Sequence, residues 1–141
     1  MEFFTFSSLP SNSPNDAPQH LVDILPKKLL IERHDLIWTL YLDDFILNDT
    51  QTSEFEDKIG EKRNFSEFIE YISAINQVSF LTALATNDKE TIESPEQFKP
   101  SRNYNNSYVL IKLNDSTEWI VQSNIPNVFF DIVKNIIFKS S

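Results

Sequence analysis

A helical period of apolar residues marks the C-terminal segment of the chain. Asp131 near the start of this segment and Lys134 and Lys139 near its end suit the dipole of a helix. Five apolar residues have the i, i+3, i+4, i+7, i+8 spacing of one helix face: Phe129, Ile132, Val133, Ile136 and Ile137. The spacing therefore predicts a C-terminal amphipathic helix.

A capping-box pattern marks the start of a second helix. Asn64 is followed three residues later by Glu67, the spacing at which each side chain can bond the other residue's backbone N–H. The apolar residues that follow also have helical spacing: Phe65, Phe68, Ile69, Ile72 and Ile75. We therefore predict a helix near residues 64–76.

Shorter helical segments are less regular. Residues 19–25 have helical spacing and precede Pro26, which disfavours a helical residue before it. Ser53 offers a start for another short helix, and Gly60, the only glycine, can end it in a left-handed conformation. Residues 27–33 fit either a further helical turn or a hairpin strand, and periodicity does not decide between them.

Alternation with a period of two predicts strands elsewhere. Residues 36–42 are apolar on both faces, which is typical of a strand internal to a sheet. A short aromatic strand is expected at residues 3–6. Residues 77–86 fit a strand by alternation and a continued helix by their leucines and alanines, and we favour the strand.

A hairpin is predicted over residues 107–123. Pairing Lys112 with Glu118 sets opposite charges across from each other and keeps apolar residues on common faces. This register needs the three-residue loop 114–116, in which Asn or Asp takes the left-handed position. A slip by one residue would mix polarities on both faces.

The remaining segments predict loops around a single domain. Residues 7–18 contain three prolines and four serines, which is typical of a tether, and residues 87–106 read as a long surface loop. The length of 141 residues fits one domain over 1–141. We expect an α+β fold with a mostly antiparallel sheet of about five strands and two main helices packed against it.

The composition excludes several kinds of chemistry. No cysteine is present, so disulfides, thiolate metal sites and a cysteine nucleophile are excluded. A single glycine is incompatible with glycine-rich phosphate loops. His20 and His34 lie in no zinc-binding spacing, and His34 and Asp35 would point to opposite faces of a strand. We expect no catalytic, cofactor-binding or metal site, and therefore not an enzyme.

Four remaining residues allow two interpretations. Asp43 and Asp44 could act as paired carboxylates or magnesium ligands, although a solvated strand end is the simpler interpretation. Trp38 and Trp119 could anchor an interface, but their strand positions favour burial in the core.

The N-terminus and the hydropathy pattern argue against export and membrane insertion. The first residues include Glu2 where a signal peptide would be basic, and the apolar run is too short for one. No stretch approaches the roughly 18 apolar residues of a membrane span. We expect a soluble, cytoplasmic protein.

Acidic residues are concentrated in one part of the chain. The formal net charge is −9, and residues 43–70 hold nine acids against three bases, a net charge of −6. The cluster is either a solvated face or a surface for a basic partner, and nucleic acid itself is a poor partner. Phe45, Phe55 and Phe65 interleave with the acids, either as interface anchors or as core residues.

Three short segments carry a resemblance to a known class of proteins. Residues 41–45, 79–84 and 119–124 resemble, in their order, strand segments of immunity proteins of bacterial toxin systems, including contact-dependent growth inhibition. The small size, acidity and lack of cysteine are similar to that class as well. The resemblance implies a cytoplasmic protein that binds and neutralises a cognate toxin domain with a basic surface, often a nuclease. We expect a monomer or weak dimer.

The predicted contact residues are the nine acids of the cluster. Two other functions remain open: a nucleic-acid mimic of the anti-restriction or anti-CRISPR type, and a non-catalytic adaptor. The predicted partner-binding residues are Asp43, Asp44, Asp49, Glu54, Glu56, Asp57, Glu61, Glu67 and Glu70.

Overall fold

One antiparallel sheet organises the molecule. The computed structural model describes residues 4–8, 17–48, 52–87, 107–115 and 118–140. Within them, five strands pair in the order β1-β5-β4-β3-β2, every neighbouring pair antiparallel. The strands are β1 (Phe4–Ser8), β2 (Ile37–Leu47), β3 (Ile75–Thr86), β4 (Tyr108–Asn114) and β5 (Glu118–Ser123). The predicted α+β class with an antiparallel sheet is confirmed.

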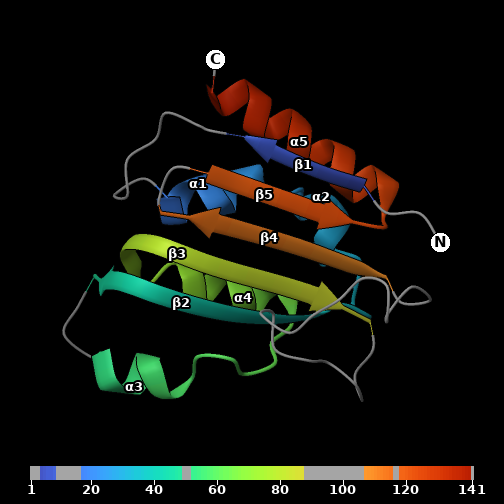
Figure 1. The fold of residues 1–141 in the computed structure, drawn as a ribbon. Helices are drawn as coiled ribbons and strands as arrows, with labels where there is room; N and C mark the ends of the chain where they lie inside the picture. The colour runs from blue at the N-terminus through green and yellow to red at the C-terminus, as the bar shows by residue number, and fades with distance from the viewer. Residues whose placement is uncertain (1–3, 9–16, 49–51, 88–106, 116–117, 141) are drawn as a thin grey trace.

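The helices cover one face of this sheet. They are α1 (Ala17–Ile24), α2 (Lys27–Ile31), α3 (Thr52–Asp57), α4 (Phe65–Ile72) and α5 (Pro126–Ser140). Figure 1 shows α1, α2, α4 and α5 on the same side of the sheet, whereas α3 lies beside the edge formed by β2. We call the opposite side of the sheet its outer face.

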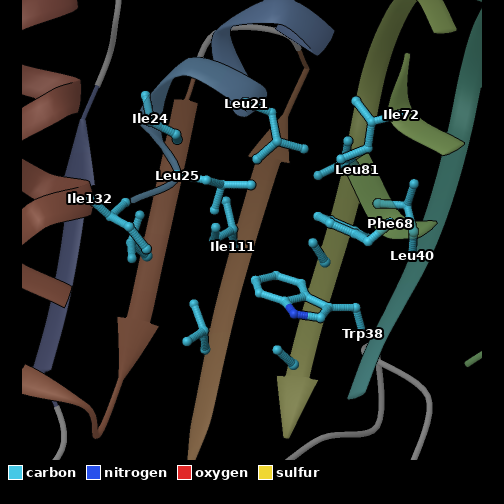
Figure 2. Close-up of a cluster of buried hydrophobic side chains, with 14 of the residues drawn as sticks. Leu21, Ile24, Leu25, Trp38, Leu40, Phe68, Ile72, Leu81, Ile111 and Ile132 are labelled. Atoms are coloured by element: carbon cyan, nitrogen blue, oxygen red, sulfur yellow. The ribbon is translucent and has the colours of Figure 1, made fainter. Parts of the chain in front are cut away.

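The core lies between the sheet and the helix layer. Figure 2 shows Leu21 of α1 and Phe68 of α4 pointing toward Trp38 and its neighbours on the strands. Trp38 lies opposite Ala85, and the small alanine leaves room for the indole ring. That ring stacks on Phe68 with 4.5 Å between the ring centroids. Trp38 and Trp119 are both fully buried, so their predicted core role is confirmed.

β2 is an edge strand, so the prediction that it is internal was wrong. A chain segment, rather than another long strand, covers its outer edge. Trp38 N–H donates to the carbonyl of Arg63 at 2.7 Å, and Arg63 N–H donates back to Trp38 at 2.8 Å. Gly60 N–H donates to the carbonyl of Leu40 at 3.0 Å. Pairing with residues 60–63 therefore gives this edge strand the surroundings of an internal one.

The alternation of β2 changes phase at Asp44. Leu42 and Phe45 both pack against the helix-side core although they are three residues apart. Strict alternation would place them on opposite faces, so one residue between them must be irregular. Asp44 supplies the irregularity with φ of +56°, a left-handed conformation that Asp adopts more readily than most residues.

The predicted register of the β4–β5 hairpin was wrong. The sequence favoured Lys112 opposite Glu118, whereas the structure pairs Lys112 with Ile120 and Asn114 with Glu118. Asn114 Nδ2 donates to Glu118 Oε1 at 3.3 Å. Each residue keeps its predicted face, so alternation alone could not separate the two registers. The expected left-handed Asp is confirmed at Asp115, with φ of +51°.

Other boundaries also differ from the sequence prediction. α4 ends at Ile72, and Ile75 begins β3 as a buried residue, so the helix predicted to residue 76 is four residues too long. The tether predicted over 7–18 is wrong at both ends, because Ser7 lies in β1 and Pro18 lies in α1. The middle of that tether lies outside the described residues, as do residues 88–106 of the predicted surface loop.

Several local predictions hold. The Asn64–Glu67 capping box is present, with both reciprocal hydrogen bonds. Residues 77–86 are strand, and residues 27–31 are helix, which settles two ambiguities. α5 buries Phe129, Ile132 and Ile136 as predicted, but Ile137 is 56% exposed and does not belong to the core.

Candidate partner-binding surface

Eight of the nine predicted contact residues lie around the β2 edge of the sheet. Asp49 lies outside the described residues, and the other eight acids are all exposed. We call these eight residues the acidic edge: Asp43, Asp44, Glu54, Glu56, Asp57, Glu61, Glu67 and Glu70.

The acidic edge has three parts on different sides of that edge. Asp43 follows the core-facing Leu42, so it projects from the outer face. Glu56 belongs to α3, which lies beside β2 (Figure 1). Glu70 belongs to α4, on the helix side of the sheet. The acids therefore wrap around the edge rather than occupy one flat face.

Internal ion pairs neutralise little of this charge. Lys58 Nζ lies 3.6 Å from Glu54, four residues away on an exposed surface. Arg63 lies 3.8 Å from Glu61. Among the described residues, the other six acids of the acidic edge have no cation within salt-bridge distance. Most of the negative charge therefore faces solvent.

An aromatic stack holds α3 against the rest of the fold. The rings of Phe45 and Phe55 lie 5.5 Å apart, and Phe55 stacks on Tyr71 at 4.1 Å with an interplanar angle of 5°. The Tyr71 hydroxyl donates to the carbonyl of Phe55 at 2.7 Å. These contacts join β2, α3 and α4, so the short α3 is fixed by packing rather than by its own length.

Arg63 completes the stack. Its guanidinium carbon lies 3.7 Å from the centroid of the Tyr71 ring, a cation–π geometry. Its side-chain nitrogens donate to the carbonyls of Lys58 at 2.9 Å and Glu61 at 3.1 Å. Burial raises the pKa of Tyr71 to about 12, and the positive charge of Arg63 acts in the opposite direction. Arg63 is 8% exposed, so its positive charge lies inside the fold and not on the surface.

The phenylalanines near the acids are core residues. Phe55 and Phe65 are buried, and Phe45 packs partly buried against the core. The exposed apolar residues at this edge are instead Phe80, 42% exposed and directly opposite Asp43, and Ile46, 55% exposed. Sequence analysis did not single out these two residues. The exposure of Phe80 could have been predicted from the sequence, because a residue next to the core-facing Leu81 must face outward.

The other candidate chemistry is used structurally. Asp35 makes two hydrogen bonds of 2.9 Å with the Arg33 guanidinium, which holds the pKa of Asp35 below its usual value. Asp35 is thus paired with Arg33, and His34 beside it is exposed. Among the described residues, no group of three His, Cys, Asp or Glu side chains could hold a metal ion.

A hollow of about 260 Å³ lies between α1, α4 and the start of β3. Ile69, Ile72 and Ile75 supply apolar parts of its lining, and Asn48 supplies an amide. None of the described residues that line it has an ionisable side chain. Within the described parts of the chain, no helix is long and apolar enough to cross a membrane.

Comparison with known protein families, curated proteins and solved structures found no match. The three segments that resemble immunity proteins all contribute to the sheet, residues 41–45 to β2, 79–84 to β3 and 119–123 to β5. The case for a function therefore depends on the chemistry of the surface.

Proposed function

We propose that the protein is a cytoplasmic immunity protein that binds a cognate toxin domain through the acidic edge and neutralises it. The target would have a basic surface, as nucleases do because they hold polyanions. The proposal combines the resemblance in three strand segments with the exposed, largely unpaired carboxylates of the acidic edge.

The placement of acids on α3 is the observation that carries the proposal. Glu56 and Asp57 lie in the last turn of this helix, which has no basic residue there. The carbonyl end of a helix is negatively polarised, so carboxylates at this end lower its stability. Both side chains are exposed, and neither has an ion-pair partner in the described structure. A basic partner would offset this unfavourable local electrostatics.

Exposed apolar groups beside the acids complete an interface-like composition. Phe80 and Ile46 are both more than two-fifths exposed, and Asp43 lies opposite Phe80. Interfaces commonly combine a few aromatic or aliphatic anchors with a charged rim that selects the partner. Phe80 would supply the anchor, and the carboxylates would supply orientation and rapid association.

Charge reversal tests the proposal directly. The toxin candidate is a domain encoded by the reading frame next to the gene. It is expressed from an inducible promoter in a cell that also produces this protein. We expect the unaltered protein to protect growth, and the Glu56→Lys, Asp57→Lys double variant to bind the purified domain at least about tenfold more weakly, since each close charge pair contributes about 1.4 kcal/mol or more.

Glu32→Lys is the control, because Glu32 is also exposed at a helix end but lies outside the acidic edge. It should leave binding unchanged within about twofold, which corresponds to less than 0.5 kcal/mol. Equal losses in both variants would show a dependence on net charge only, and normal binding by the double variant would refute the acidic edge as the contact surface. Competition between this protein and DNA for a restriction or CRISPR nuclease would favour the nucleic-acid-mimic alternative.

A further inference from the structure

The two edges of the sheet differ in how they are protected from pairing with another chain. At the β2 edge, Gly60 and Arg63 bond the outward peptide groups of the strand, and Asp44 interrupts its regular conformation. Natural sheets use cover, charge and irregularity to prevent edges from pairing with other chains. The β2 edge has all three of these protections.

β1, at the other end of the sheet, has no hydrogen-bonded cover, no charge and no irregularity in the described structure. Its outer side makes no backbone hydrogen bond to any described residue. Its residues, Phe4–Ser8, include no charged residue and no proline, and the strand pairs regularly with β5 along its whole length. Such an edge presents free N–H and C=O groups in a conformation that a further strand can extend.

An apolar stripe on α5 lies next to this edge. Phe4 of β1 contacts the rings of Phe129 and Phe130 at 5.4 and 5.2 Å. Figure 1 shows α5 running alongside β1. Phe130 is 55% exposed and Ile137 lies two turns further along the same side of the helix, with the half-buried Val133 between them. These side chains extend the apolar surface from the strand edge onto the helix layer, where the exposed Lys134, one turn after Phe130, borders the stripe.

We infer that the β1 edge and the α5 stripe form a homodimer interface, in which β1 of two copies pair antiparallel about a two-fold axis. A strand pair centred on Phe6 would place Thr5 of each copy opposite Ser7 of the other. Both side chains are exposed on the outer face, and Thr–Ser pairs are favourable across antiparallel strands. The same symmetry brings the two α5 helices together over the new strand pair.

The charge distribution favours a second copy over a charged partner here. Four strand spacings, about 19 Å, separate β1 from β2, so the acidic edge lies at the far end of the sheet. In the ten-stranded dimer the two β2 strands would be nine spacings, about 43 Å, apart. This exceeds the Debye length of about 8–10 Å several times, so the repulsion between the two acidic edges is largely screened.

Sedimentation velocity of the whole protein tests the dimer, independently of any toxin. We expect a monomer–dimer equilibrium below about 200 µM, the range in which a weak dimer is populated. Ile137→Glu should raise the dimer dissociation constant at least about tenfold. Ile46→Glu introduces the same charge at an equally exposed isoleucine of the β2 edge and should leave self-association unchanged.

A charge exchange tests the strand pairing itself. Thr5→Lys with Ser7→Lys places like charges opposite each other across the two-fold axis and should abolish the dimer, whereas Thr5→Lys with Ser7→Glu should retain it. Circular dichroism checks that both variants fold. The inference would be overturned if the protein stayed monomeric throughout the concentration range or assembled into open chains. It would also be overturned if the two isoleucine variants had equal effects, or if the dimer survived the paired lysines.

Discussion

Gly60 shows at the scale of one residue how the acidic edge is attached to the sheet. Its φ is +87°, and a Cβ at this position would lie 2.8 Å from the hydroxyl oxygen of Tyr41. Its N–H donates to Leu40 of β2, so the residue cannot move away without breaking that bond. We expect Gly60→Ala to lower the free energy of unfolding by about 1–3 kcal/mol, measured by urea denaturation.

A second variant separates the two causes of this loss. Tyr41→Phe removes the closest atom to the new Cβ but leaves the left-handed backbone unchanged. In that background Gly60→Ala should cost less, though still about 1 kcal/mol. If the substitution costs nothing in either background, the left-handed conformation of residue 60 is wrong.

Two tyrosines give the protein a sensitivity to alkaline pH. Burial raises the pKa of Tyr71 and of Tyr108 to about 12 each, above the value of about 10 expected in the unfolded chain. Both states bind the phenolic protons below pH 10, so the stability contribution is complete there. Above it the unfolded chain ionises first, so the free energy of unfolding should fall as the pH rises from about 10 to about 12.

Urea titrations at several pH values, with tyrosinate absorbance followed in parallel, check this dependence. Tyr71→Phe removes one of the two groups, so its stability should be lower at neutral pH because the hydrogen bond to Phe55 is lost. Its decline above about pH 10 should be shallower than that of the unaltered protein. An identical slope would show that Tyr71 is not buried as described.

At the scale of elements, Arg63 joins α3 to α4 and to the edge of β2. It donates to two carbonyls of the connecting segment and covers the ring of Tyr71. Arg63→Met keeps much of the side-chain volume but leaves the carbonyls of Lys58 and Glu61 without this donor. We expect a loss of about 2–4 kcal/mol in the free energy of unfolding and faster hydrogen exchange in α3.

Lys58→Met is the matched control for charge. It removes a cation from the same segment, but Lys58 is exposed and its ion pair with Glu54 spans 3.6 Å. Its expected cost is within about 0.5 kcal/mol. Arg63→Lys should resemble Arg63→Met, because an ammonium cannot bond both carbonyls and stack on the ring at once. Full stability of Arg63→Lys would assign the effect to charge alone.

Elements whose boundaries depend on local chemistry could be predicted from the sequence. The α4 cap requires only Asn64 and Glu67, and the turn that follows α3 ends at Gly60 in a left-handed conformation that suits glycine. The edge position of β2 could not be predicted, because it depends on residues 60–63 returning to cover it. The hairpin register could not be predicted either. The predicted and observed registers differ by two residues, and such a difference leaves every side chain on the same face.

Only the segment that carries the candidate surface could be predicted, from its count of acidic residues. Counting acids located it within residues 43–70, but the fold decided that Phe45, Phe55 and Phe65 turn inward. The phase change at Asp44 is the reason for Phe45, because one left-handed residue shifts the alternation of the strand and turns Phe45 toward the core. Phe80 comes to the surface beside the acids from a strand remote in sequence, which only the pairing of β2 with β3 reveals.

At the scale of the whole molecule, the acids should reduce stability if they serve binding. Six carboxylates with no cation partner among the described residues lie around one edge of the sheet, and two of them are at the unfavourable end of α3. Glu56→Gln, Asp57→Asn and Glu70→Gln together should raise the free energy of unfolding by about 0.5–1.5 kcal/mol in about 10 mM salt. The gain should shrink in about 500 mM salt, where the Debye length falls to a few ångströms.

The same triple variant should bind the toxin domain more weakly, so stability and affinity would change in opposite directions. Opposite signs are expected for groups retained for a partner, since residues that serve only the fold lower both properties when they are removed. Urea denaturation at the two salt concentrations and calorimetric titration of the toxin domain measure the two signs separately. A triple variant that is less stable and also binds weakly would identify these carboxylates as parts of the fold and would leave the acidic edge without a binding role of its own.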